Sequence, residues 1–259
     1  METPTPDTLY RYRHLMGEHR ARTAKILTDS VLYFASPASF NDPFDCKVHF
    51  RLTTSEAELR RKQQSLLRKY APDLNRAQRR TKAAQDLRTF DREKFLESVT
   101  ASFQAEVNKV GVLSLSEFPD EVLLWSHYAA SHTGLCLGFS VATDMEFFAP
   151  AQHVAYSADY PEIDMLRDDP MKHVEAFLLT KAAGWKYENE WRIIDHSTGP
   201  GEKAFLAKAL VKVILGARMS FDDKRHVAEC LNGRKDAVSV LEASVKPGSY
   251  ALDFRPYEP

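Results

Sequence analysis

Two glutamates and an arginine lie close together in the segment KYENEWRII, residues 186–194. The residues after Glu190 favour a β-strand, because Trp and two β-branched Ile suit a pleated, half-buried surface. The strand period of two would place Glu188, Glu190 and Arg192 on one face. Gathering two carboxylates and a guanidinium costs free energy unless they pair or take part in chemistry. The alternative interpretation is an exposed ion-pair ladder on an edge strand.

A second polar cluster is the FNDPFD box at residues 40–45. Asn and Asp bond their own backbone and Pro fixes φ, so the box predicts a turn. The turn could be purely structural, with its two Phe rings buried as anchors. It could equally be a ligand loop that presents Asn41, Asp42 or Asp45. Both interpretations stay open at the level of the sequence.

An aromatic cluster, WSHY, occupies residues 125–128. His132 follows His127 by five residues, whereas two histidines that share a metal on one helical face are four apart. The sequence therefore predicts no metal site. His127 and Tyr128 could stack on, or hydrogen-bond to, a base or a ribose. The alternative is a buried aromatic plug, which suits Trp125 better than His127.

Alternating and β-branched runs predict the strands that position these clusters. We expect strands at residues 9–13, 31–35, 110–115, 135–139, 153–156, 191–194, 210–215 and 238–245. We expect helices at residues 21–27, 169–183 and 221–231, and a short helix or turn at 121–130. Pro37 ends the second strand, because proline cannot donate to a strand ladder. This order of elements predicts an α+β fold with a mixed or antiparallel sheet, in a single domain over residues 1–259.

Residues 51–110 differ from the rest of the chain in pattern and in charge. They hold 14 Lys/Arg and 8 Asp/Glu, whereas residues 111–259 hold 15 Lys/Arg and 22 Asp/Glu. Ser55 and Glu58 fit a capping box, and Pro72 must interrupt the helix that they begin. We therefore predict a basic helical insertion within the domain.

The insertion carries two kinds of helical face. Four apolar residues recur every four positions between 91 and 108, as on a helix that faces a core: Phe95, Val99, Phe103 and Val107. Residues 60–82 hold nine Lys/Arg and one acidic residue, Asp73. This basic helix could bind the phosphates of a nucleic acid. The alternative is a solvated helical face.

Composition predicts a soluble, cytoplasmic protein without a membrane partner. Hydrophobic residues make up 44% and charged residues 27% of the chain, as in ordinary globular proteins. The three cysteines are far apart and form no CxxC pair, so neither a disulfide framework nor a zinc site is indicated. We find no signal-peptide pattern and no apolar run long enough to span a bilayer. The phosphate-loop, dinucleotide, GxSxG and HExxH motifs are absent, which argues against those common scaffolds.

Five sequence boxes occur in a characteristic order between Leu9 and about Gly216: LYRYR, LYFASPASFNDPFDC, VLSLSE, WSHYAASHTGLCLGF and TKAAGWKYENEWRII. Together they resemble a bacterial family known only as domain of unknown function 2971. The resemblance covers most of the chain and by itself supplies no activity.

The layout also resembles, more distantly, the ADP-ribosyltransferase fold, which implies a split sheet core. In that fold a first strand bears an Arg or His, a second strand ends in a Ser or Tyr, and a glutamate begins a later strand. The matching positions here are Arg11 or Arg13, then Ser36, then Glu190. The resemblance implies that Glu190 is the catalytic glutamate and that Glu188 is its accessory, as in arginine-modifying members.

The resemblance implies that NAD is the substrate and that the bond between nicotinamide and ribose is cleaved. Cleavage passes through an oxocarbenium-like transition state, which a nearby carboxylate stabilises. Arg11 or Arg13 would hold the pyrophosphate in a bidentate fork. Trp125, His127 or Tyr128 would stack on nicotinamide or adenine.

Further NAD contacts are expected from Ser36 and from Asn41, Asp42 and Asp45 of the FNDPFD box. The acceptor, a protein or a nucleic acid, is left open. Such an enzyme could be a toxin or a phage-defence effector.

Two other classes of function stay open. In a metal-dependent nuclease, Asp42, Asp45, Glu188 and Glu190 would gather Mg²⁺ while the basic helix bound nucleic acid. The third interpretation is a non-catalytic stress or phage-defence module.

Overall fold

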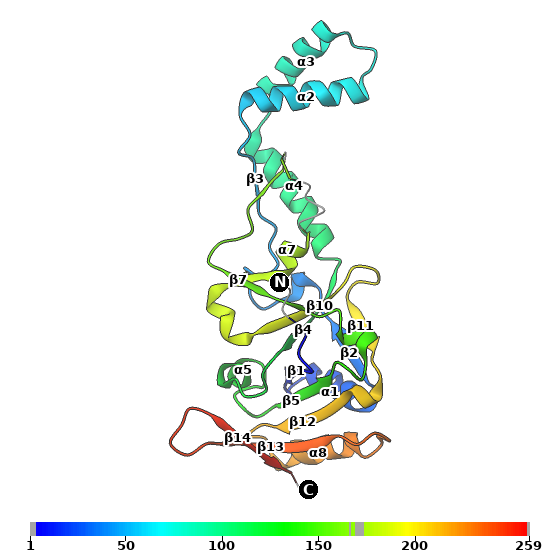
Figure 1. Ribbon diagram of the computed structural model, residues 1–259, viewed down its shortest axis with the longest axis vertical. Coiled ribbons are helices and arrows are strands. Elements are labelled where there is room, and N and C mark those ends of the chain that lie inside the picture. The colour runs from blue at the N-terminus through cyan, green and yellow to red at the C-terminus, as the bar shows by residue number, and fades with distance from the viewer. Residues whose placement is uncertain (1–3, 166, 169–173, 258–259) are drawn as a thin grey trace. The chain divides into compact units, whose positions relative to one another are not determined.

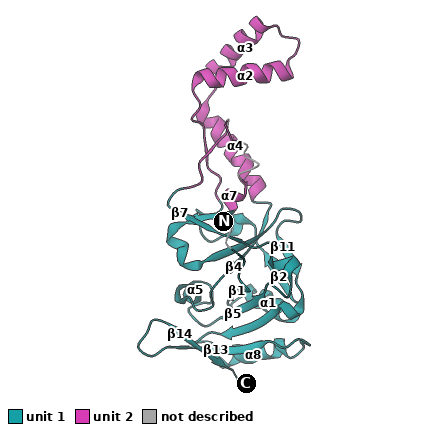
Figure 2. Cartoon of the chain, viewed as in Figure 1, with its two compact units in different colours: residues 1–46, 108–159, 179–259 teal, residues 47–107, 160–178 magenta. Residues whose placement is uncertain are grey.

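The computed structural model describes residues 4–165, 167–168 and 174–257 of the chain. These divide into two compact units (Figure 2). The first unit comprises residues 1–46, 108–159 and 179–259, and the second comprises residues 47–107 and 160–178. The predicted insertion, residues 51–110, overlaps the second unit. Among the described residues, no helix combines the length and the apolar composition that crossing a membrane requires.

The first unit is built on an eight-stranded, mostly antiparallel sheet (Figure 1). Its strands, in spatial order, are β14 (Leu252–Pro256), β13 (Ser239–Val245), β12 (Leu210–Leu215), β5 (Leu135–Ser140), β1 (Thr8–Arg13), β4 (Gly111–Ser116), β10 (Glu190–Asp195) and β6 (Gln152–His153). One pair, β12 with β13, is parallel. The predicted α+β class with a mixed sheet is therefore confirmed.

Smaller elements complete the first unit. The helices are α1 (Glu18–Thr28), α5 (Val122–His127), α6 (Met145–Phe148) and α8 (Phe221–Leu231), with 3₁₀ turns η1 (Pro37–Ser39), η3 (Ala183–Glu188) and η4 (Ala207–Ala209). Two short strand pairs lie outside the main sheet: β2 (Val31–Phe34) with β11 (Gly201–Ala204), antiparallel, and β7 (Ala155–Ser157) with β9 (Thr180–Ala182), parallel.

The alternation of side chains along β1 assigns each sheet face to its own core. Leu9 belongs to the larger apolar cluster, which includes Ile26 of α1 and Val227 of α8. Tyr10 and Tyr12, which are offset from Leu9 by odd numbers of residues, join a second cluster with Trp125 of α5. Period-two alternation therefore buries both faces of the central strand.

The centre of the sheet is joined at one register position. Strand β1 pairs with β5 along its whole length, and β4 pairs with β10 along its whole length. Between β1 and β4 the paired residues are Tyr10 and Ser116. Beyond them the strands part, and Ala35, after β2, exchanges backbone hydrogen bonds with Val112 of β4. The β5–β1 pair and the β4–β10 pair are therefore joined through the single residue pair Tyr10 and Ser116.

The second unit contains β3 (Phe50–Arg51), α2 (Glu56–Tyr70), α3 (Arg76–Arg88), α4 (Arg92–Val107), β8 (Ile163–Asp164) and most of α7 (Val174–Leu179). Strands β3 and β8 form a short parallel pair. Phe50 packs edge-on against Phe103 of α4, with ring centroids 5.1 Å apart, and against Phe177 of α7 at 5.7 Å. The predicted apolar stripe of α4 thus contributes to a core within this unit.

Several local predictions are wrong. The helix expected at 169–183 covers residues 174–179, after which Thr180–Ala182 form strand β9; residues 169–173 lie outside the described residues. Residues 183–188, which begin at the last residue of the expected helix, form the 3₁₀ turn η3. The strand expected at 153–156 is two strands that meet at Val154. None of the expected strands corresponds to β3, β8, β11 or β14.

Candidate functional site

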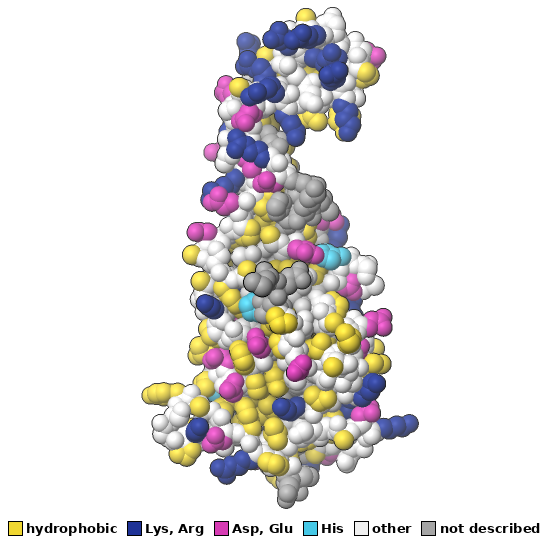
Figure 3. Space-filling view, viewed as in Figure 1, with side chains coloured by type: hydrophobic (Ala, Val, Ile, Leu, Met, Phe, Trp, Pro, Cys, Tyr) yellow, Lys and Arg dark blue, Asp and Glu magenta, His cyan; other side chains and the backbone are white. Residues whose placement is uncertain are grey.

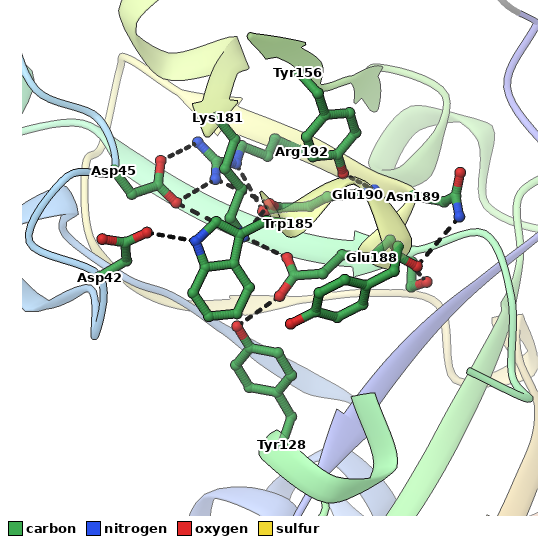
Figure 4. A network of polar contacts seen from close by, with 12 residues as sticks. Asp42, Asp45, Tyr128, Tyr156, Lys181, Trp185, Glu188, Asn189, Glu190 and Arg192 are labelled. Atoms are coloured by element: carbon green, nitrogen blue, oxygen red, sulfur yellow. Dashed lines mark hydrogen bonds and ion pairs between the residues drawn. The ribbon is translucent and has the colours of Figure 1, made fainter. Parts of the chain in front are cut away.

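Five charged side chains of the first unit form a buried cluster (Figure 4). They are Asp45, Lys181, Glu188, Glu190 and Arg192, and each is 7% exposed or less. Asp45 comes from the FNDPFD box, Lys181 from β9, Glu188 from η3, and Glu190 and Arg192 from β10. The alternative of an exposed ion-pair ladder is therefore wrong, because these side chains are shielded from water.

Arg192 is the anchor of this charge cluster. Its Nε and Nη2 donate to the two carboxylate oxygens of Glu190 at 2.7 and 3.0 Å. Its Nη1 and Nη2 donate to the two oxygens of Asp45 at 3.0 and 2.6 Å. The Phe40 ring lies 5.5 Å from the guanidinium carbon. Two bidentate carboxylates fix the planar guanidinium, and an arginine is well suited to this geometry. Arg192 thus joins the FNDPFD box to strand β10.

Lys181 links the two glutamates. Its ammonium donates to Glu188 Oε2 and, at 2.9 Å, to Glu190 Oε2. The Trp185 ring centroid lies 5.2 Å from the same nitrogen. The Tyr128 hydroxyl donates to the other oxygen of Glu188, Oε1, at 2.8 Å. Glu188 therefore holds one neutral and one cationic partner, whereas Glu190 is held by two cations.

This difference separates the protonation of the two glutamates. Burial raises the pKa of Glu188, and the ammonium of Lys181 only partly offsets that effect. Burial would also raise the pKa of Glu190, but Arg192 and then Lys181 outweigh it and hold the pKa at about 2. For Lys181, burial lowers the pKa, yet Glu190 and Glu188 outweigh burial and the net shift is upward. Glu190 is consequently a fixed anion, and Glu188 is the carboxylate that protonates more readily.

The convergence of the two glutamates depends on one backbone conformation. Glu188 is the last residue of η3 and not a strand residue, so the prediction that strand periodicity aligns it with Glu190 is wrong. Asn189 between them has φ 41° and ψ 55°, in the left-handed region. Asn tolerates this region better than most residues. The turn at Asn189 lets both carboxylates reach Lys181.

A pocket of about 290 Å³ opens where β1 and β4 part. Its lining includes Arg11 and Arg13 of β1, Asn41 and Asp45 of the FNDPFD box, and Tyr128, Lys181, Glu188 and Glu190. All of its lining residues belong to the first unit. The structure therefore brings the first-strand arginines and the paired glutamates, which are far apart in sequence, to one cavity.

Arg11 and Arg13 give this pocket a cationic wall. Arg11 Nη1 donates to the Ser114 carbonyl of β4 at 2.6 Å. Arg13 contacts Thr23 Oγ1 and His19 Nδ1. Neither forms an ion pair with a carboxylate in the described part of the chain. Burial lowers the pKa of both arginines, and an arginine still remains protonated at neutral pH. Such half-buried guanidinium groups suit an anionic ligand.

Four residues expected at the site do not line the pocket. The Ser36 hydroxyl donates to the Asn108 carbonyl at 2.6 Å and caps η1. The Asp42 carboxylate accepts from Trp185 Nε1 at 2.7 Å and from the Phe44 amide. Both side chains therefore stabilise loops next to the site.

The two aromatic candidates outside the pocket differ in exposure. Trp125 is 0% exposed and donates from Nε1 to the Pro119 carbonyl, so it cannot stack on a ligand. Its role is the buried plug that the sequence left as an alternative. His127 is exposed and contacts the rings of Tyr128, Trp185 and Tyr187. It therefore lies beside the site without lining it.

The sequence reading missed two contributions to the pocket. Lys181 is not among the expected site residues, because nothing at its position signals a contact with glutamates seven and nine residues later. Tyr10 and Tyr12 also line the pocket, and their alternation with the two arginines in LYRYR is a signal that could have indicated them. The prediction that both FNDPFD rings are buried is wrong for Phe44, which is 66% exposed.

The carboxylates of the charge cluster are engaged by cations. Asp45 and Glu190 bond Arg192, and Glu188 and Glu190 bond Lys181. Within the described ranges, no group of three or more His, Cys, Asp or Glu side chains is arranged to hold a metal ion. Binding a cation here would require displacing Lys181 or Arg192.

One protein-family model matches the chain, over residues 124–193. The matched segment runs from α5 to β10. It contains four members of the charge cluster: Lys181, Glu188, Glu190 and Arg192. No curated protein and no solved structure matches the chain, so the likeness to the ADP-ribosyltransferase fold stays a prediction. The family expected from the five boxes is confirmed for this segment: residues 124–193 match the model of the family described as protein of unknown function (DUF2971).

Proposed function

We propose that the first unit is an ADP-ribosyltransferase-like enzyme that binds NAD in the pocket between β1 and β4. The observation that carries the proposal is the polarity of this pocket. Arg11 and Arg13 bring positive charge without an acidic ion-pair partner in the described ranges, and Glu190 brings a carboxylate that stays ionised. NAD has the complementary pattern, an anionic pyrophosphate and a cationic nicotinamide ring. Groups of both signs in one pocket can orient such a ligand through electrostatic complementarity.

The chemistry follows from the charge that develops at the ribose. The bond between ribose C1′ and the nicotinamide nitrogen breaks, its electron pair goes to the ring nitrogen, and neutral nicotinamide leaves. Positive charge then spreads over the ribose C1′ and ring oxygen. A carboxylate fixed beforehand stabilises this charge more in the transition state than in the ground state.

Glu190 is equipped for that role. Its two oxygens accept three hydrogen bonds, from Lys181 and Arg192, whereas a carboxylate offers about four acceptor sites. One site is left for the ribose 2′-hydroxyl. The fixed orientation costs no reorganisation when charge develops.

Glu188 has the properties of an accessory base. Its raised pKa makes it a better proton acceptor than Glu190, as general-base catalysis near neutral pH requires. The acceptor group of a protein side chain or a nucleic acid attacks C1′ and gives its proton to the Glu188 carboxylate. We infer that this step, and not the release of nicotinamide, depends on Glu188.

The test is nicotinamide release by wild type, Glu190→Gln and Glu188→Gln, together with NAD titration by calorimetry. Glu190→Gln should lower turnover on the order of 10²–10³-fold, as loss of one well-placed electrostatic group does, with little change in NAD affinity. Glu188→Gln should impair transfer to an acceptor more than hydrolysis of NAD. Arg11→Lys, which keeps the charge but loses the fork, should weaken NAD binding.

The folded state of each variant must be checked, because removing one partner of a buried ion pair is destabilising. Glu190→Gln changes the cluster from two cations and three carboxylates to two cations, Lys181 and Arg192, and two carboxylates, Asp45 and Glu188, so each cation keeps an anionic partner. Thermal unfolding identifies variants that have lost the fold. Absence of NAD binding by wild type, or unchanged release by a folded Glu190→Gln variant, would contradict the proposal. The charge cluster would then be a structural ion-pair network, and the interpretation as a non-catalytic module would be favoured.

A role as a toxin or phage-defence effector has a simple readout under this proposal. Expression of the wild type should slow bacterial growth and lower cellular NAD or modify an acceptor. Glu190→Gln should do neither.

A further inference from the structure

The second unit carries a helical hairpin, helices α2 and α3, with a high density of positive charge. Nine Lys/Arg lie between residues 60 and 82: Arg60, Arg61, Lys62, Arg68, Lys69, Arg76, Arg79, Arg80 and Lys82. All but Arg79 are exposed. Figure 3 shows these cationic side chains gathered over the two helices. We call this surface the basic hairpin.

Most cations of the basic hairpin have no acidic partner among the residues that the structure describes. Of the nine cations, Lys82 has an acidic partner among the described residues, Asp86 at 3.6 Å. Arg61 and Arg79 donate to the backbone carbonyls of Ala57 and Leu74 and keep their charge. A solvent-exposed helix that binds no partner commonly carries charges of both signs, which form i,i+4 ion pairs. This surface instead concentrates one sign of charge, as polyanion-binding surfaces do.

The hairpin is a folded platform and not a flexible basic tail. Each helix begins with a complete capping box, Ser55 with Glu58 in α2 and Asn75 with Gln78 in α3. The two helices pack against each other, and Gln63 of α2 donates to Asp86 of α3 at 2.8 Å. Backbone positions of the cations are therefore fixed before any partner binds, which reduces the entropy lost on binding.

Cations on α2 repeat at the spacing of two helical turns. Arg61 and Arg68 are seven residues apart, which places them on one side of the helix and roughly 10.5 Å apart along its axis. Lys62 and Lys69 form a neighbouring row with the same spacing. The buried side chains of α2, Leu59 and Leu67, lie on other sides of the helix. The rows are thus free to face a partner.

The residues around the cations indicate which class of polyanion the basic hairpin favours. A helix that binds a membrane surface inserts a continuous apolar face, whereas Leu59 and Leu67 of α2 are buried by packing and Leu66 is the large aliphatic residue that α2 exposes. Binding of single strands relies on several aromatic side chains that stack on bases. In the described part of the hairpin the exposed aromatic residue is Tyr70, with the Lys69 ammonium 5.1 Å from its ring centroid. A duplex, contacted through its phosphates, fits these features best.

We propose that the basic hairpin binds double-stranded nucleic acid through phosphate contacts, without reading base sequence. This proposal is independent of the NAD site, because every hairpin residue lies in the second unit and every pocket residue in the first.

The test is fluorescence anisotropy of a labelled 20-base-pair duplex titrated with the full chain, with separate DNA and RNA arms and without NAD. The duplex should bind at 50 mM salt and dissociate progressively toward 200 mM, with a linear log–log dependence. Arg61→Gln/Arg68→Gln removes two cations and keeps good helix formers. It should weaken binding about 10- to 100-fold and lower the salt slope by about two, because each phosphate contact contributes about 0.9 to that slope.

The matched control is Lys208→Gln/Lys246→Gln, which removes the same charge from two exposed lysines of the first unit. This control should bind the duplex like wild type, and Arg61→Lys/Arg68→Lys should retain most of the affinity. Binding that does not respond to salt, equal weakening by the control, tighter binding to a single strand, or binding to vesicles containing phosphatidylserine but not to duplexes would each overturn the proposal.

Discussion

Glu188 and Glu190 are two residues apart and share the Lys181 ammonium, yet their pKa values are shifted in opposite directions. Both residues are glutamates, so the residue type does not explain the opposite pKa shifts. Arg192 adds two hydrogen bonds and a full positive charge to Glu190, whereas Glu188 receives a neutral hydroxyl from Tyr128. Pairs of titratable groups whose environments separate their pKa values are common at catalytic sites. The divergence is what allows one carboxylate to remain charged while the other exchanges a proton.

The same divergence predicts how folding stability depends on pH. Glu190 has a folded-state pKa of about 2, below its ordinary 4.5, so its stabilisation is present above 4.5 and is lost as pH falls toward 2. The pKa of Glu188 is raised, so its neutral form is favoured in the folded state and stability declines as pH rises above 4.5. We expect Glu190→Gln to flatten the acid limb and Glu188→Gln to gain relative stability as pH rises.

Urea unfolding of wild type and both variants between pH 2 and 7 measures these effects. Glu146→Gln, at an exposed position of the first unit, is the matched control and should follow the wild-type curve. Parallel curves for wild type and Glu190→Gln below pH 4.5 would contradict the assignment of Glu190 as the fixed anion.

At the scale of elements, local signals were sufficient where they agreed with one another. The predicted limits of β12 and α8 match the structure, Leu210–Leu215 and Phe221–Leu231. An apolar, β-branched run defines β12, and the Ser220 side chain caps α8 by accepting from the Asp223 amide. Likewise Ser55 and Glu58 begin α2, and the helix ends before Pro72. Caps and prolines act within a few residues, which is why the sequence reveals them.

Elements that depend on distant partners could not be predicted in this way. Residues 180–182 follow a helix and form strand β9 only because they pair with β7, some 25 positions earlier in the chain. The pocket likewise depends on residues that are distant in sequence. Arg11 reaches the Ser114 carbonyl because β1 and β4 part beyond Tyr10, and no local pattern in LYRYR encodes that separation. Long-range pairing overrides local propensity in such places.

Asn189 is the element-scale feature on which the site depends most directly. Its left-handed backbone, φ 41°, connects η3 to β10 and turns both glutamates toward Lys181. A residue with a Cβ and no polar side chain should pay about 1–2 kcal/mol in this conformation, whereas glycine adopts it readily. We therefore predict that Asn189→Ala destabilises the protein by that amount and lowers nicotinamide release, and that Asn189→Gly is better tolerated.

The two substitutions are matched, because each removes the hydrogen bond from Asn189 Nδ2 to the Tyr187 carbonyl. Urea unfolding and the nicotinamide assay compare them directly. Equal losses for Ala and Gly would mean that the side-chain hydrogen bond, and not the backbone conformation, is what matters.

At the scale of the whole molecule, the chain separates two kinds of charge. The first unit encloses a mixed, largely buried site in which guanidinium, ammonium and carboxylate groups offset one another. The second unit exposes one sign of charge on the basic hairpin. The chain enters the second unit twice, at residues 47–107 and 160–178, and both segments contribute to its core through Phe50, Phe103 and Phe177. Helices α2 and α3 lie between β3 and α4, so they can be altered without removing that core.

This arrangement predicts that replacing residues 56–88 by a Gly/Ser linker of about ten residues separates the two proposed activities. Duplex binding should be lost, because the cations are removed. NAD affinity and nicotinamide release should stay within about twofold of wild type, since no pocket residue lies in the deleted segment. The matched control exchanges only the nine cations for Gln and leaves both helices in place. Loss of nicotinamide release in the linker variant, with release retained in the Gln control, would show that the helices support the first unit and are not a separate binding element.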